Sequence, residues 1–131
     1  MAKIRVLIAD DHETILARVR SVLSNEFEIV GTVTNGRDAV KEVRRLDPDV
    51  LVIDISMPVL DGLQAVSELQ STNRRTKVVF LTVHEDPDFV TAALSAGASG
   101  YVTKSHLTTD LVPAIREALE GHNYVSQSIP Q

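Results

Sequence analysis

The sequence predicts an α/β domain built on a parallel sheet that helices cover on both faces. Short apolar runs rich in β-branched residues alternate five times with segments in which apolar residues recur at helical spacing. This alternation is typical of parallel strands joined by helical crossovers. The chain has 131 residues, enough for one domain with a single core.

The first half of the chain supplies three of the expected strands. The runs IRVLIA and VLVI read as buried strands, and FEIVGTV reads as a further strand between them. Asn35-Gly36 marks a turn, and the second helix should stop before Pro48. The expected elements are a strand at 4–9, a helix at 15–23, a strand at 27–33, a helix at 39–46 and a strand at 50–53.

The second half continues the pattern as far as residue 119. Gly97 stands where it would stop the fourth helix. The expected elements are a helix at 63–69, a strand at 77–83, a helix at 89–94, a strand at 100–103 and a helix at 111–119. From residue 121 the composition becomes polar and loop-like, which is typical of a linker.

Composition and charge exclude several classes of protein. No apolar stretch approaches the ~20 residues of a transmembrane helix, and the first residues lack the apolar core of a secretory signal. The absence of cysteine excludes disulfides and thiolate metal sites and fits a cytoplasmic location. The net charge of −5, without a basic run, argues against a nucleic-acid binder. We therefore expect a cytoplasmic domain with no membrane partner.

Polar residues stand where the predicted strands end. Asp54 follows four aliphatic residues, and a carboxylate is poorly tolerated in an apolar interior unless something binds it or chemistry uses it. Asp10 and Asp11 follow the first strand, Thr82 lies near the end of the fourth, and Lys104 follows the fifth. Because parallel strands bring their carboxyl ends to one edge of the sheet, these groups should meet there.

Each of these residues alone also has an ordinary structural interpretation. An aspartate after the first strand could cap a helix, Thr82 could be a plain strand residue, and Lys104 could be a solvated loop lysine. Their joint placement favours a site. Two carboxylates at about 4 Å repel by on the order of 4 kcal/mol at an effective dielectric near 20, so a cation is required, and oxygen ligands suit Mg²⁺. With a lysine and a hydroxyl to receive a phosphoryl group, Asp54 would be the nucleophile that forms an acyl phosphate.

Four motifs occur in an order and spacing that are highly specific as a set: ADD at 9–11, VIDISMPVLDG at 52–62, FLT at 80–82 and SGYVTK at 99–104. From residue 3 to about residue 121 the chain resembles the receiver domain of two-component response regulators. The resemblance implies a flavodoxin-like (CheY-like), doubly wound fold with five helices and five parallel strands in the order 2-1-3-4-5. It divides the chain into a receiver at 1–121 and a linker or tail at 122–131.

The resemblance also implies which residues hold a metal ion and which one is phosphorylated. Asp54 resembles the phosphoacceptor. Asp11, Asp54 and the backbone carbonyl of Ser56 resemble the ligands of Mg²⁺, with Mn²⁺ as an alternative ion. Asp10 would assist through a metal-bound water.

Three further residues match positions that respond to phosphorylation. Thr82 and Lys104 resemble the pair that binds the phosphoryl oxygens. Tyr101 resembles an aromatic switch residue whose side chain moves in response to Thr82. The implied activity is Mg²⁺-dependent self-phosphorylation from a phosphodonor and autodephosphorylation, so the domain would not be an enzyme acting on other substrates.

The stretches AGASGYVTKS and LTVHED resemble the NarL/FixJ (LuxR-like) subfamily, in which a linker joins the receiver to a helix-turn-helix domain. We expect a two-domain transcription factor whose output domain is absent from this sequence; the alternative is a stand-alone receiver that acts through protein–protein contacts. The implied partners are a sensor histidine kinase, DNA only through the missing output domain, and a second copy of the chain on phosphorylation.

Some local features need separate predictions. Many receivers carry a cis proline after the lysine, and Ser105 stands there instead, so we expect a trans peptide. Met57-Pro58 and Asp61-Gly62 should form turns, with Gly62 at positive φ. The histidines at 12, 84, 106 and 122 are interpreted as surface residues, with His84 near the site.

Two other classes of protein use related folds. A haloacid-dehalogenase-like phosphatase has a D-x-D-x-T pattern after its first strand, which the run DDHET at 10–14 breaks. A flavodoxin-like FMN module has a Ser/Thr/Gly-rich phosphate loop at the same place, where this chain has two acids. Steady turnover of a phosphomonoester would indicate the phosphatase, and a yellow protein would indicate the flavin module.

Overall fold

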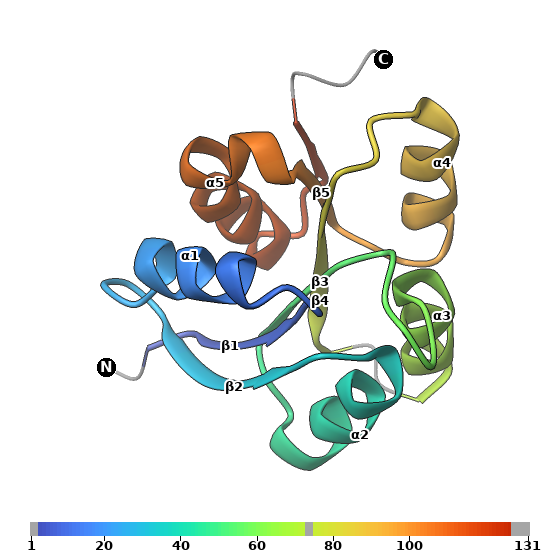
Figure 1. Ribbon diagram of the computed structural model, residues 1–131, viewed down its shortest axis with the longest axis horizontal. Helices are drawn as coiled ribbons and strands as arrows, with labels where there is room; N and C mark the ends of the chain where they lie inside the picture. The colour runs from blue at the N-terminus through green and yellow to red at the C-terminus, as the bar shows by residue number, and fades with distance from the viewer. Residues whose placement is uncertain (1–2, 73–74, 127–131) are drawn as a thin grey trace.

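The computed structural model describes residues 3–72 and 75–126 and contains a parallel sheet of six strands in the order β2-β1-β3-β4-β5-β6 (Figure 1). The strands are β1 (Arg5–Ala9), β2 (Glu28–Val33), β3 (Val50–Ile53), β4 (Lys77–Thr82), β5 (Gly100–Thr103) and β6 (Tyr124–Val125). The helices are α1 (Glu13–Leu23), α2 (Gly36–Leu46), α3 (Gly62–Thr72), α4 (Pro87–Ser95), the short 3₁₀ helix η1 (Lys104–His106) and α5 (Leu107–Leu119).

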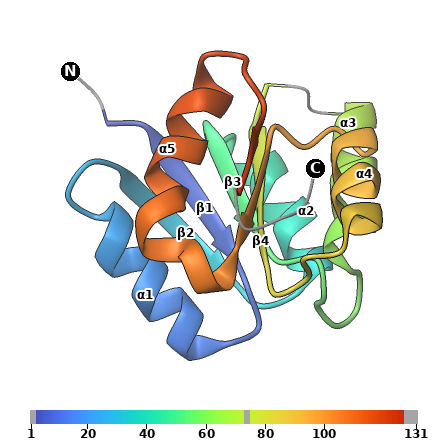
Figure 2. The same ribbon diagram turned by 90° about the horizontal axis from the view of Figure 1, so that it is seen from above.

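The helices form two layers, one on each face of the sheet (Figures 1 and 2). Along β1, Leu7 and Ala9 belong to a core with α2, α3 and α4, whereas Val6 and Ile8 belong to a core with α1 and α5. Successive strand residues point to opposite faces, so a strand needs apolar side chains on both when both are covered. The predicted doubly wound fold and the order of its first five strands are confirmed.

The predicted helix and strand boundaries differ from the structure by only a few residues. Helix α2 ends at Leu46, and the next residue, Asp47, adopts a left-handed conformation just before Pro48. Helix α4 begins after Asp86, whose side chain accepts a hydrogen bond from the backbone N–H of Asp88. It ends before Gly97, whose φ of +110° and backbone hydrogen bond to Leu94 close the helix.

The sixth strand lies within the segment expected to be a linker. Strand β6 pairs in parallel with β5, with Gly100 opposite Tyr124 and Tyr101 opposite Val125. Its sequence carries too short an apolar pattern to distinguish it from a loop. No helix within the described ranges 3–72 and 75–126 is long and apolar enough to cross a bilayer.

The loop after β3 has an unusual backbone that places Asp54 beside the start of α3. Gly62 does not have the positive φ predicted for it; instead, Val59 has φ 71° at the centre of a tight turn in which the N–H of Leu60 bonds to the carbonyl of Pro58. Glycine is needed at 62 because a Cβ there would lie 2.1 Å from the backbone oxygen of Asp54. Among the described residues all peptide bonds are trans, as predicted for the bond that follows Lys104.

Candidate functional site

Three strand ends bring a lysine and two carboxylates together in the interior. Asp10 follows β1, Asp54 follows β3 and Lys104 follows β5, and all three are buried. The Nζ of Lys104 lies 2.9 Å from Oδ2 of Asp10 and 3.0 Å from Oδ2 of Asp54. The lysine therefore bridges the two carboxylates, which would otherwise repel each other in a medium of low dielectric.

The charges of this group shift one another's proton affinity. Burial raises the pKa of Asp54, and the hydrogen bond from Lys104 only partly offsets that rise. Burial alone would lower the pKa of Lys104, but its hydrogen bonds to Asp10 and Asp54 reverse the effect and raise it. The lysine thus stays charged, and Asp54 is a carboxylate whose negative charge is costly in this site.

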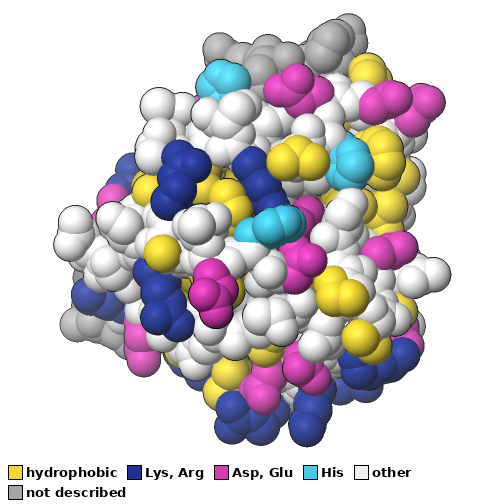
Figure 3. Space-filling view, viewed as in Figure 1, with side chains coloured by type: hydrophobic (Ala, Val, Ile, Leu, Met, Phe, Trp, Pro, Cys, Tyr) yellow, Lys and Arg dark blue, Asp and Glu magenta, His cyan; other side chains and the backbone are white. Residues whose placement is uncertain are grey.

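Asp11 and His12 continue the cluster toward solvent. Asp10, Asp11, His12 and Asp54 each offer a ligand atom within 4.8 Å of the others. The Nδ1 of His12 lies 3.1 Å from Oδ1 of Asp10 and 3.0 Å from Oδ1 of Asp11. Near the middle of the view in Figure 3, acidic, histidine and basic side chains lie next to one another at the surface.

The donor set of this cluster fits a divalent cation. Among the residues described by the structure, Oδ2 of Asp10 is the buried side-chain atom that has no hydrogen-bond partner, although the ion pair with Lys104 lies close to it. Carboxylate oxygens from Asp10, Asp11 and Asp54 are the ligand type that Mg²⁺ prefers. A cation near Asp11 would add the charge that one lysine cannot supply to three carboxylates.

The second oxygen of Asp54 is held by the loop that follows it. The backbone N–H of Ser56 donates to Oδ1 of Asp54 at 3.2 Å. The hydroxyl of Ser56 lies 2.7 Å from Nε2 of His84, whose ring stacks on Phe89 with centroids 4.2 Å apart. The loops after β3 and β4 are therefore joined directly above Asp54, and His84 neighbours the site as predicted.

Thr82 lies on β4 and Tyr101 on the neighbouring strand β5, and both side chains contact the backbone of His84. Both side chains are fully buried, and the hydroxyl of Thr82 accepts a hydrogen bond from the N–H of His84 at 3.2 Å. The hydroxyl of Tyr101 donates to the carbonyl of His84 at 2.8 Å. Burial, with smaller contributions from Asp86 and Asp54, raises the pKa of Tyr101 to about 12. The ring is thus neutral and fully buried.

The sequence predicted that the strand-end residues would lie together, but it did not place His12 among them. The structure brings together Asp10, Asp11, Asp54 and Lys104, with Ser56, Thr82 and Tyr101 around them. His12 is exposed, as interpreted, yet its ring nitrogen lies within the acidic cluster. Its position directly after Asp10-Asp11 was the available signal.

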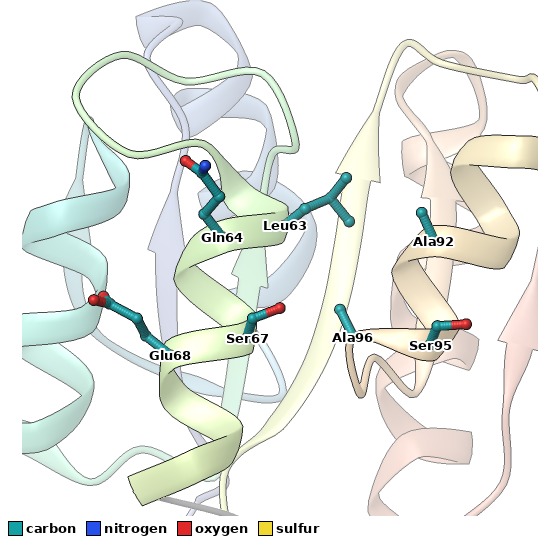
Figure 4. Close-up of a pocket in the computed structure, with 7 residues that line it drawn as sticks. All are labelled: Leu63, Gln64, Ser67, Glu68, Ala92, Ser95 and Ala96. Carbon is teal, nitrogen blue, oxygen red and sulfur yellow. The ribbon is translucent and has the colours of Figure 1, made fainter.

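A separate groove of about 630 Å³ lies between α3 and α4, away from the carboxylates (Figure 4). Leu63 and Ala92 point into it from opposite helices, with Ser67, Ser95 and Ala96 along its length. None of the strand-end residues lines it. The groove is therefore separate from the acidic cluster at the strand ends.

Comparison with known proteins points to one family. Residues 6–116 match the sequence pattern of the family described as response regulator receiver domain. The chain is 38% identical over 130 residues to the response regulator GacA of Pseudomonas viridiflava and 35% identical to the response regulator UvrY of Escherichia coli K12. These alignments cover 98% of the chain but only 61% and 60% of the two relatives, so the chain spans about three fifths of their length.

A solved structure supports the same family at the level of the fold. The crystal structure of a two-component response regulator of the LuxR family from Aurantimonas sp. SI85-9A1 superposes with a TM-score of 0.92 at 28% identity. The match covers 98% of this chain and 93% of that one. The similarity therefore extends over nearly the whole of both chains.

Proposed function

The chain belongs to the response regulator receiver domain family, and from this membership we propose that Asp54 accepts a phosphoryl group from a histidine kinase. The observation that carries the proposal is the burial of Asp54 in direct contact with a charged lysine at the edge of the sheet. Asp54 is the carboxylate that joins a strand end to the loop carrying Ser56.

In the transfer step, a carboxylate oxygen of Asp54 would form a bond to phosphorus while the bond from phosphorus to the imidazole nitrogen of the donor breaks. The leaving imidazole recovers a proton from solvent. The raised pKa of Asp54 keeps its electron pair reactive, because a buried carboxylate is stabilised less than one in water. The N–H of Ser56, 3.2 Å from Oδ1, orients the group.

Asp10, Asp11 and Asp54 would hold Mg²⁺, or Mn²⁺ in its place, together with the backbone carbonyl of Ser56. When bound, the ion supplies positive charge that offsets the negative charge of the carboxylates and of the transferring phosphoryl group. Asp10 is buried and Asp11 is exposed, so they differ in how readily they exchange with solvent. Asp10 would therefore contact the ion from the buried side of the site, and Asp11 would contact it from the side that is open to solvent.

Lys104 and Thr82 would receive the phosphoryl oxygens. Lys104 is engaged by two carboxylates, so it must exchange one of these contacts for a phosphoryl oxygen. The hydroxyl of Thr82 accepts a bond from the N–H of His84, which leaves its own proton available to a new acceptor. Movement of Thr82 toward the phosphoryl group would alter the His84 peptide, to which Tyr101 donates. This shared peptide supports Tyr101 as the switch residue.

The partners follow from the relatives as proposals for the longer protein. Response regulators such as GacA and UvrY extend beyond the region matched here. We propose that the receiver extends through β6 (Tyr124–Val125) and that the linker begins after it, later than the boundary at residue 121 expected from the sequence. The linker would lead to a DNA-binding output domain controlled by phosphorylation, with a sensor kinase as donor in the cytoplasm and a second receiver as a partner after phosphorylation.

Labelling with a small phosphodonor tests the proposal. The wild-type chain should incorporate one phosphoryl group from acetyl phosphate in the presence of Mg²⁺, in a linkage that tolerates acid but is labile to base and hydroxylamine. The substitution Asp54→Asn should abolish this label while the circular dichroism spectrum is unchanged. Asp61→Asn is the matched control, because Asp61 lies in the same loop and its Oδ1 accepts the N–H of Gln64, which asparagine can also do. Undiminished labelling of Asp54→Asn would refute the proposal.

A further inference from the structure

Strand β6 is fixed to the edge of the sheet by hydrogen bonds on both sides of a very short segment. The N–H of Tyr124 donates to the carbonyl of Ser99, and the N–H of Ser126 donates to the carbonyl of Tyr101, both at 2.9 Å. Val125 packs against the core on the α4 side, whereas Tyr124 packs against the core that contains α5. Residues 124–126 therefore pack against the apolar cores on both faces of the sheet and pair with its edge strand β5.

A buried serine ends this strand and acts as its anchor. Ser126 is fully buried, and its hydroxyl donates to Oδ2 of Asp110 at 2.7 Å while accepting the N–H of Thr103 at 3.2 Å. The negative charge of Asp110 also contributes, after burial, to raising the pKa of Tyr124. Such an anchor is specific, because the loss of hydration of a buried hydroxyl is costly unless protein groups satisfy both its donor and acceptor functions.

The anchor is attached to the backbone that carries the phosphorylation site. Thr103 directly precedes Lys104, the residue that contacts Asp10 and Asp54. The carbonyl of Tyr101, which accepts the bond from Ser126, belongs to the residue whose hydroxyl holds the His84 peptide. Two of the residues that bind Ser126, Tyr101 and Thr103, thus belong to the site's switch or adjoin the site.

Strand β6 also has the properties of an element with two states. It has two residues, pairs with one neighbour and lies at the edge of the sheet, so its detachment would break only the contacts described above and leave the other five strands paired. Detachment would expose the edge of β5. An element of this kind responds to any group that stabilises its docked state more than its detached state.

We propose that phosphorylation of Asp54 and docking of β6 through its Ser126–Asp110 anchor stabilise each other. This coupling would transmit phosphorylation to the polypeptide that leaves the domain. The proposal rests on the proposed function of Asp54. A phosphoryl group gives Lys104 a more highly charged partner than a carboxylate, which orders the end of β5 and the turn into α5. Ordered backbone at Thr103 holds the Ser126 hydroxyl in place. Conversely, a docked β6 already restricts the motion of β5 in the unphosphorylated domain. Phosphorylation then costs less conformational entropy, because β5 is already ordered.

Hydrogen exchange and ligand affinity together test this coupling. The probe is beryllofluoride with Mg²⁺, added to the full chain as a mimic of the phosphoryl group. In the wild type, the amides of Tyr124 and Ser126 should exchange several-fold more slowly with the probe than without it. Coupling is reciprocal, so Ser126→Ala should bind beryllofluoride about fivefold more weakly, at the lower end of common allosteric effects.

Two further variants separate the anchor from general disturbance. Asn123→Ala alters an exposed residue next to β6 and should leave both the affinity and the exchange unchanged. Asp110→Ala removes the other half of the anchor and should weaken affinity as Ser126→Ala does. The effects of the two substitutions should be less than additive in the double variant, because both remove the hydrogen bond between Ser126 and Asp110.

The outcomes separate this inference from the function on which it rests. If the wild type binds no beryllofluoride, the proposed function fails and the coupling fails with it. If the wild type binds the probe but exchange in β6 is unchanged and Ser126→Ala binds as the wild type does, the coupling alone is overturned. Equal weakening by Asn123→Ala and Ser126→Ala would also overturn it.

Discussion

Replacing Lys104 by methionine should lower the free energy of unfolding by about 3–5 kcal/mol at neutral pH, the usual effect of removing one partner from a buried ion pair. The lysine Nζ lies 2.9 and 3.0 Å from oxygens of Asp10 and Asp54. At an effective dielectric of about 20, each contact at that distance is an attraction of roughly 5 kcal/mol. Without the lysine, two buried carboxylates face each other, while methionine still fills most of the space.

Urea denaturation followed by circular dichroism measures this loss, and a second variant shows its origin. In the Asp54→Asn background only one carboxylate depends on the lysine, so Lys104→Met should cost at least about 1 kcal/mol less there than in the wild type. Lys41→Met is the control, because Lys41 lies exposed on α2 and its replacement should change stability by no more than about 0.5 kcal/mol.

The pH dependence of the Lys104→Met variant has a definite sign. Loss of the lysine removes the hydrogen bond and the attraction that partly offset burial, so the pKa of Asp54 should rise further above its value in the unfolded chain. Groups with a raised pKa favour the folded state at low pH, so the deficit relative to wild type should shrink as the pH falls below neutral. A deficit equal to that of Lys41→Met, or one that persists unchanged in the Asp54→Asn background, would refute the bridging role of Lys104.

Three other predictions concern stability and titration. Gly62→Ala should lower the free energy of unfolding, measured by urea denaturation, more than Gly121→Ala does. A Cβ at 62 would lie 2.1 Å from backbone, whereas at 121 only the φ of +84° opposes the substitution, at a cost of about 1–2 kcal/mol. Equal losses would contradict this. Val59→Gly should raise the thermal midpoint by relieving a positive φ of 71° at an exposed residue, and a lower midpoint would show that the turn is not strained. Tyr101 should ionise near pH 12, measured by phenolate absorbance in the Tyr124→Phe variant. The stability that its buried neutral form contributes should be full below about pH 10 and be lost as the pH rises toward 12.

The strands and helices were predictable because burial on both faces leaves a strong pattern in the sequence. The prediction for β3, a run of four aliphatic residues, matches the structure at both ends. Strand β6 was not predictable, since its pairing depends on backbone groups and on the hydroxyl of Ser126, and neither produces apolar periodicity. The prediction for Gly62 was wrong in its reason: the residue is required by the approach of another backbone segment, which only tertiary structure shows.

Strand ends also explain why the site was predictable as a set but not in its contacts. Parallel strands must bring Asp10, Asp54 and Lys104 to one edge, yet which carboxylate the lysine contacts depends on side-chain directions within the η1 turn. The bridge to both acids has a consequence for the proposed function. Lys104 already supplies to Asp54 the positive charge that a phosphoryl group would later claim, so phosphorylation exchanges one ion pair for another. The energy available for switching is then the difference between these two pairs. A difference of this kind is easily altered by nearby contacts such as those of Thr103 and Ser126.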